Sequence, residues 1–308
     1  MDYGIHLPLI AFDGKPCSLE HLLAYVETAE RLGYQMLAAN DHLVFSRPWL
    51  DGPTALAAVL AHTGRMTLAT TVALPTVRGP APLAKTLAAI DLLSGGRLVV
   101  GVGPGSSSRD YAAVGVPFEE RWKRLDEAVN ALRALWHGTP FTGQFYATEG
   151  QALEPRPAQH PGPPIWIGSW GSEAGLRRAA HLGDGWLASA YNTTPEMFAA
   201  AWQRLRVHVR QAGKDPDCFP NAIATMFCYV TEDRSKADCI VRDVLSPMLH
   251  RPEDQLRQRL LVGPAQECAE KLAAYQEAGA QRVLLWPVAD EHRQLELLGE
   301  QVLPLVQA

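Results

Sequence analysis

Asp41 and His42 form the clearest acid–base pair in this sequence. They follow a predicted strand, 35–39, with Asn40 between. An imidazole beside a carboxylate can exchange a proton with a bound molecule or orient it. We therefore predict that the pair is catalytic. A cap on the following segment is the structural alternative for Asp41.

A second feature with chemical meaning is the glycine-rich end of another apolar run. Residues 98–100 have no polar alternation, which is typical of a strand buried on both faces of a parallel sheet. The run leads into Gly101, Gly103 and Gly105, followed by Ser106. Where β-carbons are missing, a flat ligand can lie close to the backbone. Close helix–strand packing is the alternative, but three alternating glycines at a strand end favour a ligand.

The other residues at predicted strand ends narrow the chemistry. All six lysines fall on predicted helices or loops, which argues against Schiff-base catalysis. No His-x-His pair or carboxylate cluster occurs at these ends, so we predict no metal and disfavour a metal-dependent hydrolase. The remaining side chains are small, hydroxylated or apolar. Such a lining suits a flat aromatic cofactor.

Composition excludes several classes of partner. The net charge of −5 and the pI near 6.1 argue against nucleic acid or an anionic membrane as the main partner. No apolar run approaches the roughly 18 residues of a membrane span. The five cysteines are odd in number and scattered, so they indicate neither a disulfide framework nor a zinc site. We expect a cytoplasmic protein that acts on a small molecule.

Strands and helices alternate along the chain, and this alternation must position the candidate residues. Eight such units favour a closed (β/α)8 barrel, in which the strand ends gather at one face and carry the active site. An open doubly wound sheet is the alternative, but the first strand lacks a Gly-x-Gly-x-x-Gly turn after it. The predicted strands are 3–8, 35–39, 67–72, 98–102, 164–168, 186–189, 221–230 and 282–286.

One segment interrupts this alternation. Residues 137–163 follow the fourth predicted helix, 119–136, and are rich in Gly, Pro, Thr and aromatic residues. We predict an inserted hairpin and loop there. Residues 256–262 are ambiguous between helix and strand. Because no long linker occurs, we expect one domain over 1–308.

Several segments resemble the luciferase-like monooxygenase family, the bacterial-luciferase-type barrels that use reduced FMN or the deazaflavin coenzyme F420. The similarity runs in family order over nearly the whole chain. It implies the barrel fold, a flavin or deazaflavin cofactor and, since relatives commonly dimerise, a homodimer. The matching segments are 40–43 (Asn-Asp-His-Leu), 73–78 with 92–97, 101–105 with 115–121, 164–168 with 182–186, and 263–286.

The resemblance also implies roles for single residues. His42 would lie over the cofactor ring, and the family's non-proline cis peptide corresponds to the bond between Thr71 and Val72. The residues expected along the pyrimidine side of the ring are Gly103, Gly105 and Ser106. Those expected at the ribityl chain and phosphate are Gly168, Ser169 and Ser189.

Three further residues are predicted to line the substrate pocket: His6, Trp49 and Trp170. For His6 the alternative is a satisfied core or rim histidine, and for the two tryptophans it is ordinary core packing.

The sequence departs from the family pattern at two positions. Some deazaflavin-dependent dehydrogenases carry a catalytic Glu where this chain has Ser106, which argues against sugar-phosphate oxidation. A lysine that contacts phosphate in those relatives corresponds to Asn192. His250 and Arg251 are candidates to supply the missing positive charge.

The preferred interpretation is an F420-dependent oxidoreductase that transfers hydride to or from a small organic substrate. The first alternative is a monooxygenase that uses reduced FMN and oxygen, and it would need a separate flavin reductase because nothing resembles a nicotinamide site. The second alternative is a non-catalytic flavin-binding barrel. The substrate itself depends on loops that the sequence pattern does not constrain.

Overall fold

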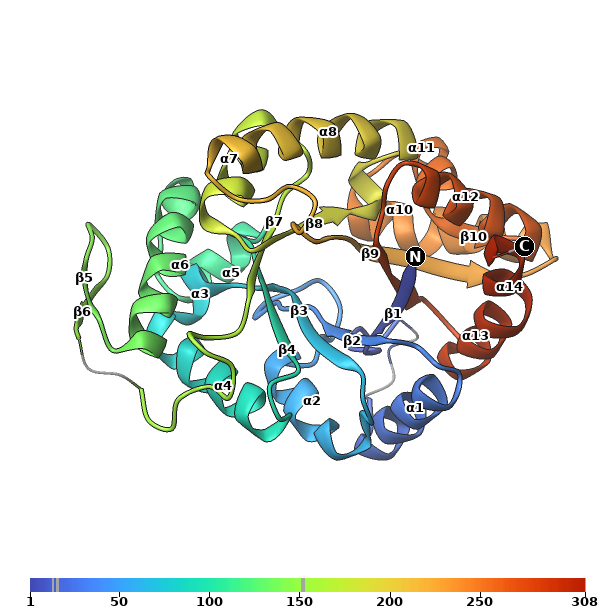
Figure 1. The fold of residues 1–308 in the computed structure, drawn as a ribbon. Helices are drawn as coiled ribbons and strands as arrows, with labels where there is room; N and C mark the ends of the chain where they lie inside the picture. Colours follow the sequence, from blue (N-terminus) through green and yellow to red (C-terminus); the bar gives the residue numbers. More distant parts are fainter. Residues whose placement is uncertain (13, 15–16, 151–152, 308) are drawn as a thin grey trace.

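The chain forms a closed barrel of parallel strands, seen in Figure 1 as a computed structural model. The structure describes residues 1–307 except 13, 15–16 and 151–152. The barrel strands are β1 (Asp2–His6), β2 (Met36–Ala39), β3 (Thr67–Ala73), β4 (Leu98–Val102), β7 (Ile165–Gly168), β8 (Gly185–Ser189), β9 (Asn221–Val230) and β11 (Arg282–Pro287). They pair in this order, and β11 pairs with β1. The β8–β9 pairing completes the ring, so the predicted (β/α)8 barrel is confirmed and the open sheet is excluded.

Helices surround the barrel (Figure 1). The longer ones are α1 (Leu19–Arg31), α2 (Gly52–Ala58), α4 (Pro80–Leu93), α6 (Arg121–His137), α7 (Glu173–Leu182), α8 (Pro195–Gln211), α12 (Ala265–Glu277) and α13 (Glu291–Leu297). Side-chain caps mark where several of these helices begin. The Ser18 hydroxyl caps α1 by accepting from the His21 N–H, and Ser172 caps α7 in the same way. Among the described residues, no helix is both long and apolar enough to span a bilayer.

Several short strands and helices are added to the barrel and its surrounding helices. The antiparallel strands β5 (Pro140–Thr142) and β6 (Ala147–Glu149) form a hairpin outside α6, which confirms the predicted insertion (Figure 1). The ambiguous segment divides into α11 (Glu253–Arg259) and β10 (Leu261–Gly263), a strand added beside β9. Two short helices that the sequence pattern did not predict are α3 (Pro75–Arg78) and α5 (Ser108–Ala113). The remaining short helices are α9 (Arg234–Cys239), α10 (Ser246–Leu249) and α14 (Leu303–Gln307).

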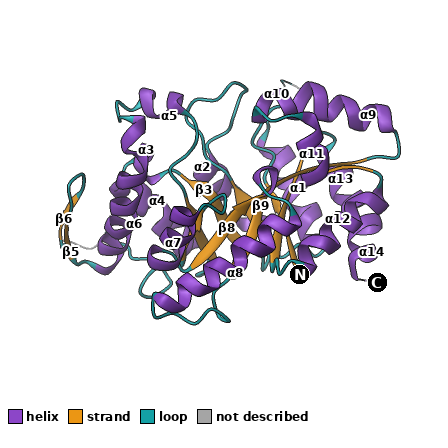
Figure 2. Cartoon of the chain, turned by 90° about the horizontal axis from the view of Figure 1, so that it is seen from above, coloured by secondary structure: helices purple, strands orange, loops and turns teal. Residues whose placement is uncertain are grey.

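The strands alternate between two cores. Leu37 and Ile5 pack outward against the helices, whereas Met36, Ala38 and Leu284 belong to a separate cluster inside the barrel. Figure 2 shows α5, α9 and α10 at one end of the barrel and both termini at the other. Because α5 follows β4 and α9 follows β9, the first of these ends is the carboxyl end of the strands.

Strand β3 carries an irregularity at this carboxyl end. The bond between Thr71 and Val72 is cis, as the family resemblance implies, and the register between β3 and β4 shifts between Thr70 and Ala73. The Val72 side chain then lies against two glycines. A β-carbon at Gly103 would stand 2.8 Å from Val72 Cγ2, and one at Gly168 would stand 2.9 Å from Val72 Cγ1. Both glycines are therefore needed for packing against Val72, and for Gly103 this adds to the prediction that it admits a ligand.

We predict that Gly103→Ala lowers the free energy of unfolding by about 1–3 kcal/mol, since the added methyl must displace Val72. The matched control is Gly299→Ala in the helical segment Leu298–Val302. A β-carbon there meets only Leu32 at 3.7 Å, so the change should be neutral or stabilising. Urea unfolding curves measure both. Equal midpoints for the two variants would contradict the packing argument.

Candidate active site

A cavity of about 340 Å³ opens at the carboxyl ends of the strands. It contains the predicted catalytic residues Asp41 and His42, and all of the predicted cofactor contacts: Thr71, Val72, Gly103, Gly105, Ser106, Gly168, Ser169 and Ser189. Trp170 also lines it, with 55% of its surface exposed. His6 and Trp49 do not line it. The structure thus gathers most of the predicted site residues around one cavity.

The cavity lining combines an apolar surface with polar ends. Val72, Leu74, Leu187, Ala188 and Ala224 supply the apolar part. The polar groups include His42 after β2, Arg121 at the start of α6, Ser169 and Ser172 after β7, and Ser189 at the end of β8. A mostly apolar cavity with a few convergent polar groups is typical of sites that bind a planar organic cofactor. The residues present therefore fit the flavin-type ring that the resemblance implies.

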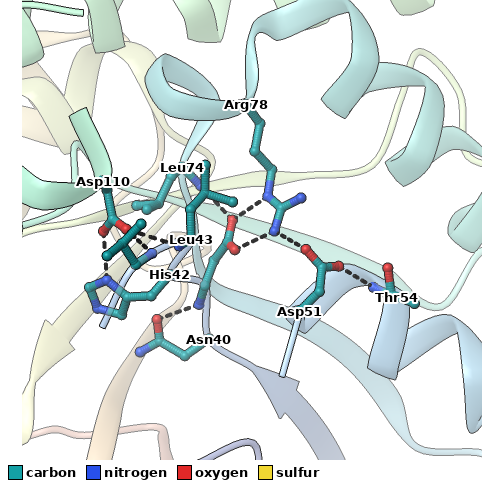
Figure 3. A network of polar contacts seen from close by, with 10 residues as sticks. Asn40, His42, Leu43, Asp51, Thr54, Leu74, Arg78 and Asp110 are labelled. Atoms are coloured by element: carbon teal, nitrogen blue, oxygen red, sulfur yellow. Dashed lines mark hydrogen bonds and ion pairs between the residues drawn. The ribbon is translucent and has the colours of Figure 1, made fainter. Parts of the chain in front are cut away.

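His42 is held by a buried carboxylate that the sequence analysis did not single out (Figure 3). Its Nδ1 lies 2.7 Å from Asp110 Oδ2, while Asp110 Oδ1 accepts hydrogen bonds from the backbone N–H groups of Leu43 and Val44 at 2.9 and 2.7 Å. Burial by itself would raise the pKa of Asp110, but these hydrogen bonds and the nearby His42 lower it below its usual value. Since Asp110 is ionised, His42 carries a proton on Nδ1 and its Nε2 is the ring nitrogen left for a ligand.

Asp41 has a different partner. Its carboxylate accepts two hydrogen bonds from Arg78, at 2.7 Å from Nε and 2.6 Å from Nη2, and a third from the Leu74 N–H at 3.3 Å (Figure 3). Arg78 also pairs with Asp51, whose carboxylate accepts from the Thr54 N–H at the start of α2. This differs from the prediction that Asp41 and His42 form the acid–base pair. The paired carboxylate of His42 is Asp110, and Asp41 fixes α3 beside the cavity.

Aromatic residues enclose His42. Trp49 meets the imidazole edge-on at a centroid distance of 4.6 Å, and Phe45 lies at 4.8 Å. Trp49 also packs edge-on against Trp286 at 5.7 Å. The predicted wall residue Trp49 thus supports the histidine from behind instead of lining the cavity.

His6 lies in the barrel interior beneath the site. Its ring stacks on Trp286 at 4.3 Å, and its Nε2 accepts a hydrogen bond from the Thr225 N–H at 3.2 Å. The proton of the neutral ring is therefore on Nδ1, which lies 3.5 Å from the Thr71 hydroxyl. Burial lowers the pKa of His6 to about 3. This is the satisfied core histidine that the sequence analysis kept as its alternative to a substrate contact.

Sequence reasoning missed other residues of the cavity. Tyr191, Phe118, Arg121 and Trp122 line it, as does Thr225, which has a φ of 57°. Phe118 and Arg121 lie within the segment 115–121 that carries the family resemblance, and that match was the available signal. No local pattern marks Asp110, because its partners lie 66–68 residues away in the chain.

The fold and the cavity define a (β/α)8-barrel enzyme with a cofactor-sized site at the carboxyl ends of its strands. A sequence profile of the luciferase-like monooxygenases matches residues 9–282. The chain therefore belongs to the luciferase-like monooxygenase family, and the predicted family and oxidoreductase class are confirmed.

Individual relatives agree with this assignment. An F420-dependent glucose-6-phosphate dehydrogenase from Nakamurella multipartita is 30% identical over 91% of this chain and 90% of its own length. An F420-dependent hydroxymycolic acid dehydrogenase from Mycobacterium tuberculosis is 31% identical over 71% of this chain and 61% of its own length. The crystal structure of monooxygenase RslO1 from Streptomyces bottropensis superposes with a TM-score of 0.84 at 26% identity, covering 99% of both chains.

The Asp110 contact predicts the tautomer of His42. In neutral His42 the proton should reside on Nδ1. Asp110→Asn should move it to Nε2, because the Nδ1–H would lose its charged hydrogen bond to a carboxylate. The ¹⁵N chemical shifts of the labelled imidazoles report this change. His6 is the internal control, since the Thr225 N–H keeps its proton on Nδ1 in both proteins. Unchanged His42 signals in Asp110→Asn would contradict the assignment.

His6 predicts a pH dependence of stability. Its folded pKa of about 3 lies below the ordinary value near 6.5, so folding expels a proton between these limits. Its contribution to stability should therefore decline as pH falls, with a slope of up to about 1.4 kcal/mol per pH unit. The pKa values of Asp110 and Asp51 are lowered, so their contributions to the free energy of unfolding are lost only below about pH 4.

Urea unfolding between about pH 4.5 and 6.5 measures this effect together with that of His292, whose pKa burial also lowers, so the His6 share is the difference between wild type and His6→Phe. His6→Phe should keep the stacking on Trp286 but flatten the slope by close to one proton, whereas the exposed control His181→Gln should leave the slope unchanged. A slope that His6→Phe does not alter would show that the buried histidine is not the group responsible.

Proposed function

We propose that this chain is an F420-dependent oxidoreductase that transfers hydride between the deazaflavin and a small organic substrate. The single observation that carries the proposal is the position of His42, held by Asp110 at the edge of an apolar cavity. The names of two relatives at 30–31% identity, both F420-dependent dehydrogenases, favour this cofactor.

The cofactor ring is proposed to lie on the apolar lining above Val72, with Gly103, Gly105 and Ser106 along one edge. Its side chain and phosphate would extend toward Gly168, Ser169 and Ser189 and the start of α7. The first backbone N–H groups of a helix favour an anion, and Ser172 caps this one. When bound, the deazaflavin supplies the carbon that accepts or donates the hydride.

His42 is the proposed proton carrier. Oxidation of an alcohol removes a hydride from carbon and a proton from oxygen, and His42 Nε2 is placed to accept that proton while Asp110 stabilises the resulting imidazolium. Of the described residues that line the cavity, the acidic one is Asp41, and Arg78 holds its carboxylate. Ser106 lies where some relatives carry a glutamate, so proton transfer here depends on His42.

A second candidate function is an FMN-dependent monooxygenase with a separate reductase. It is favoured by the likeness to monooxygenase RslO1, which extends over 99% of both chains. The same cavity serves either cofactor ring, so binding selectivity distinguishes the two functions.

Anaerobic equilibrium titration with F420 and FMN, each oxidised and reduced, tests the choice of cofactor. We expect F420 to bind at least about 10-fold more tightly than FMN, and a panel of alcohols to reduce it. Tighter binding of reduced FMN, with substrate-dependent oxygen uptake, would establish the monooxygenase instead. Binding of neither cofactor would contradict both functions.

His42→Asn tests the proton carrier. Turnover should fall by about 100-fold or more, because the asparagine amide cannot accept the proton, while cofactor affinity should stay within a few fold. The control is His181→Asn on the exposed end of α7, which should leave both quantities unchanged. Undiminished turnover in His42→Asn would refute the catalytic role.

A further inference from the structure

Apolar side chains are exposed around the mouth of the cavity. Trp122, at the start of α6, and Trp170, after β7, both line the cavity and reach solvent, so they lie where it opens. Leu43 and Val44 directly follow the proposed proton carrier, and Val114 follows α5. Each of the five is at least 37% exposed. We call these five residues the apolar rim.

Hydrogen bonds fix the two segments that carry the aliphatic part of the rim. The backbone N–H groups of Leu43 and Val44 donate to Asp110 Oδ1 at 2.9 and 2.7 Å, which ties both residues to α5, the helix that leads to Val114. The hydroxyl of Tyr111, also in α5, lies 2.7 Å from a threonine hydroxyl of α3. The loop after β2 and the end of α5 therefore hold fixed positions beside the cavity.

An arginine packs against each tryptophan of the rim. The guanidinium carbon of Arg178 lies 4.6 Å from the ring centre of Trp122, and that of Arg251 lies 5.8 Å from the ring centre of Trp170. A guanidinium group is weakly hydrated and stacks readily on an indole face. These contacts orient the two rings while leaving part of each exposed at the mouth.

The size of the cavity indicates what the rim is for. Its volume of about 340 Å³ is near the lower end of the range of about 300–1,000 Å³ that is typical of small-molecule sites. A bound cofactor ring would fill much of it, so the remaining space suits only the reacting end of a substrate. Single exposed apolar side chains are ordinary, but five around one opening indicate a surface that an apolar ligand covers.

We propose that the apolar rim binds the hydrocarbon body of the substrate. The substrate class is then a neutral alcohol, or the corresponding ketone, whose apolar chain or fused rings extend beyond the cavity. Its oxygen lies at His42 and its body lies against the rim. The identity of the reacting group rests on the proposed function. The apolar surface does not, because it binds a hydrocarbon body whatever group that body carries.

Calorimetric titration of the cofactor-free protein with 2-butanol and 2-decanol tests the rim without any turnover. The two alcohols share the reacting group, and the longer one adds six methylenes. We expect 2-decanol to bind at least about 10-fold more tightly, since each methylene favours binding by up to about 4-fold when it is buried. Leu43→Ser and Val114→Ser should each reduce this preference by about 3-fold. The matched control is Leu93→Ser, because Leu93 is 73% exposed but ends α4, at the amino end of the barrel, and the preference should persist there.

Three results would overturn the proposal: equal affinity for the two alcohols, no binding of either, or a preference that both rim variants retain as fully as Leu93→Ser does. Rim variants that sediment as a smaller species and keep the preference would assign the rim to a contact between two copies of this chain, which also overturns it.

Turnover provides a separate arm. In the F420-loaded enzyme, the ratio of kcat/KM for 2-decanol to that for 2-butanol should fall in Leu43→Ser and Val114→Ser but not in Leu93→Ser. If F420 does not bind, or if no alcohol reduces it, the proposed function fails while the cofactor-free affinities still decide the role of the rim.

Discussion

The candidate active site depends on the hydrogen bonds that the buried carboxylate of Asp110 accepts. This carboxylate accepts hydrogen bonds from the imidazole of His42 and from two consecutive backbone N–H groups, those of Leu43 and Val44. It therefore joins the loop after β2 to α5, an excursion of the chain after β4. In a buried environment an unpaired carboxylate is costly, so all three donors favour the same loop conformation. With Nδ1 occupied by Asp110, Nε2 is the ring nitrogen of His42 that remains for a ligand.

The barrel adds a second constraint, the separation of polar groups by an apolar surface. His42 lies at one side of the ring, Ser169 follows β7 and Ser189 ends β8 at another, and much of the lining of the cavity is apolar. Val72 projects into this lining because β3 is irregular where it faces β4, and two glycines make room for it. Such a site suits a planar ring held by apolar contact, with polar ends available to orient a ligand.

Much of this arrangement was predictable because strand ends in a parallel barrel converge. Once the periodicity indicated eight strand–helix units, the residues after each strand became candidates, and the catalytic and cofactor candidates, with Trp170, line the cavity. Trp49 and His6 were misplaced for a simple reason. Periodicity placed His6 at a strand end, and Trp49 lies in the loop after His42, but neither position says whether the side chain points into the cavity or packs behind it. Trp49 packs edge-on behind His42, and His6 stacks on Trp286 inside the barrel.

The amino-acid sequence alone determined the barrel, the inserted hairpin, the family and the set of strand-end residues, because these depend on local periodicity and on motifs of adjacent residues. Only the tertiary structure decided which charges meet. Asp110 lies 68 residues from His42, Arg78 lies 37 from Asp41, and Arg251 lies 59 from Asn192. Pairings over such distances depend on how loops from different strands pack at one end of the barrel, and no short-range pattern encodes that packing.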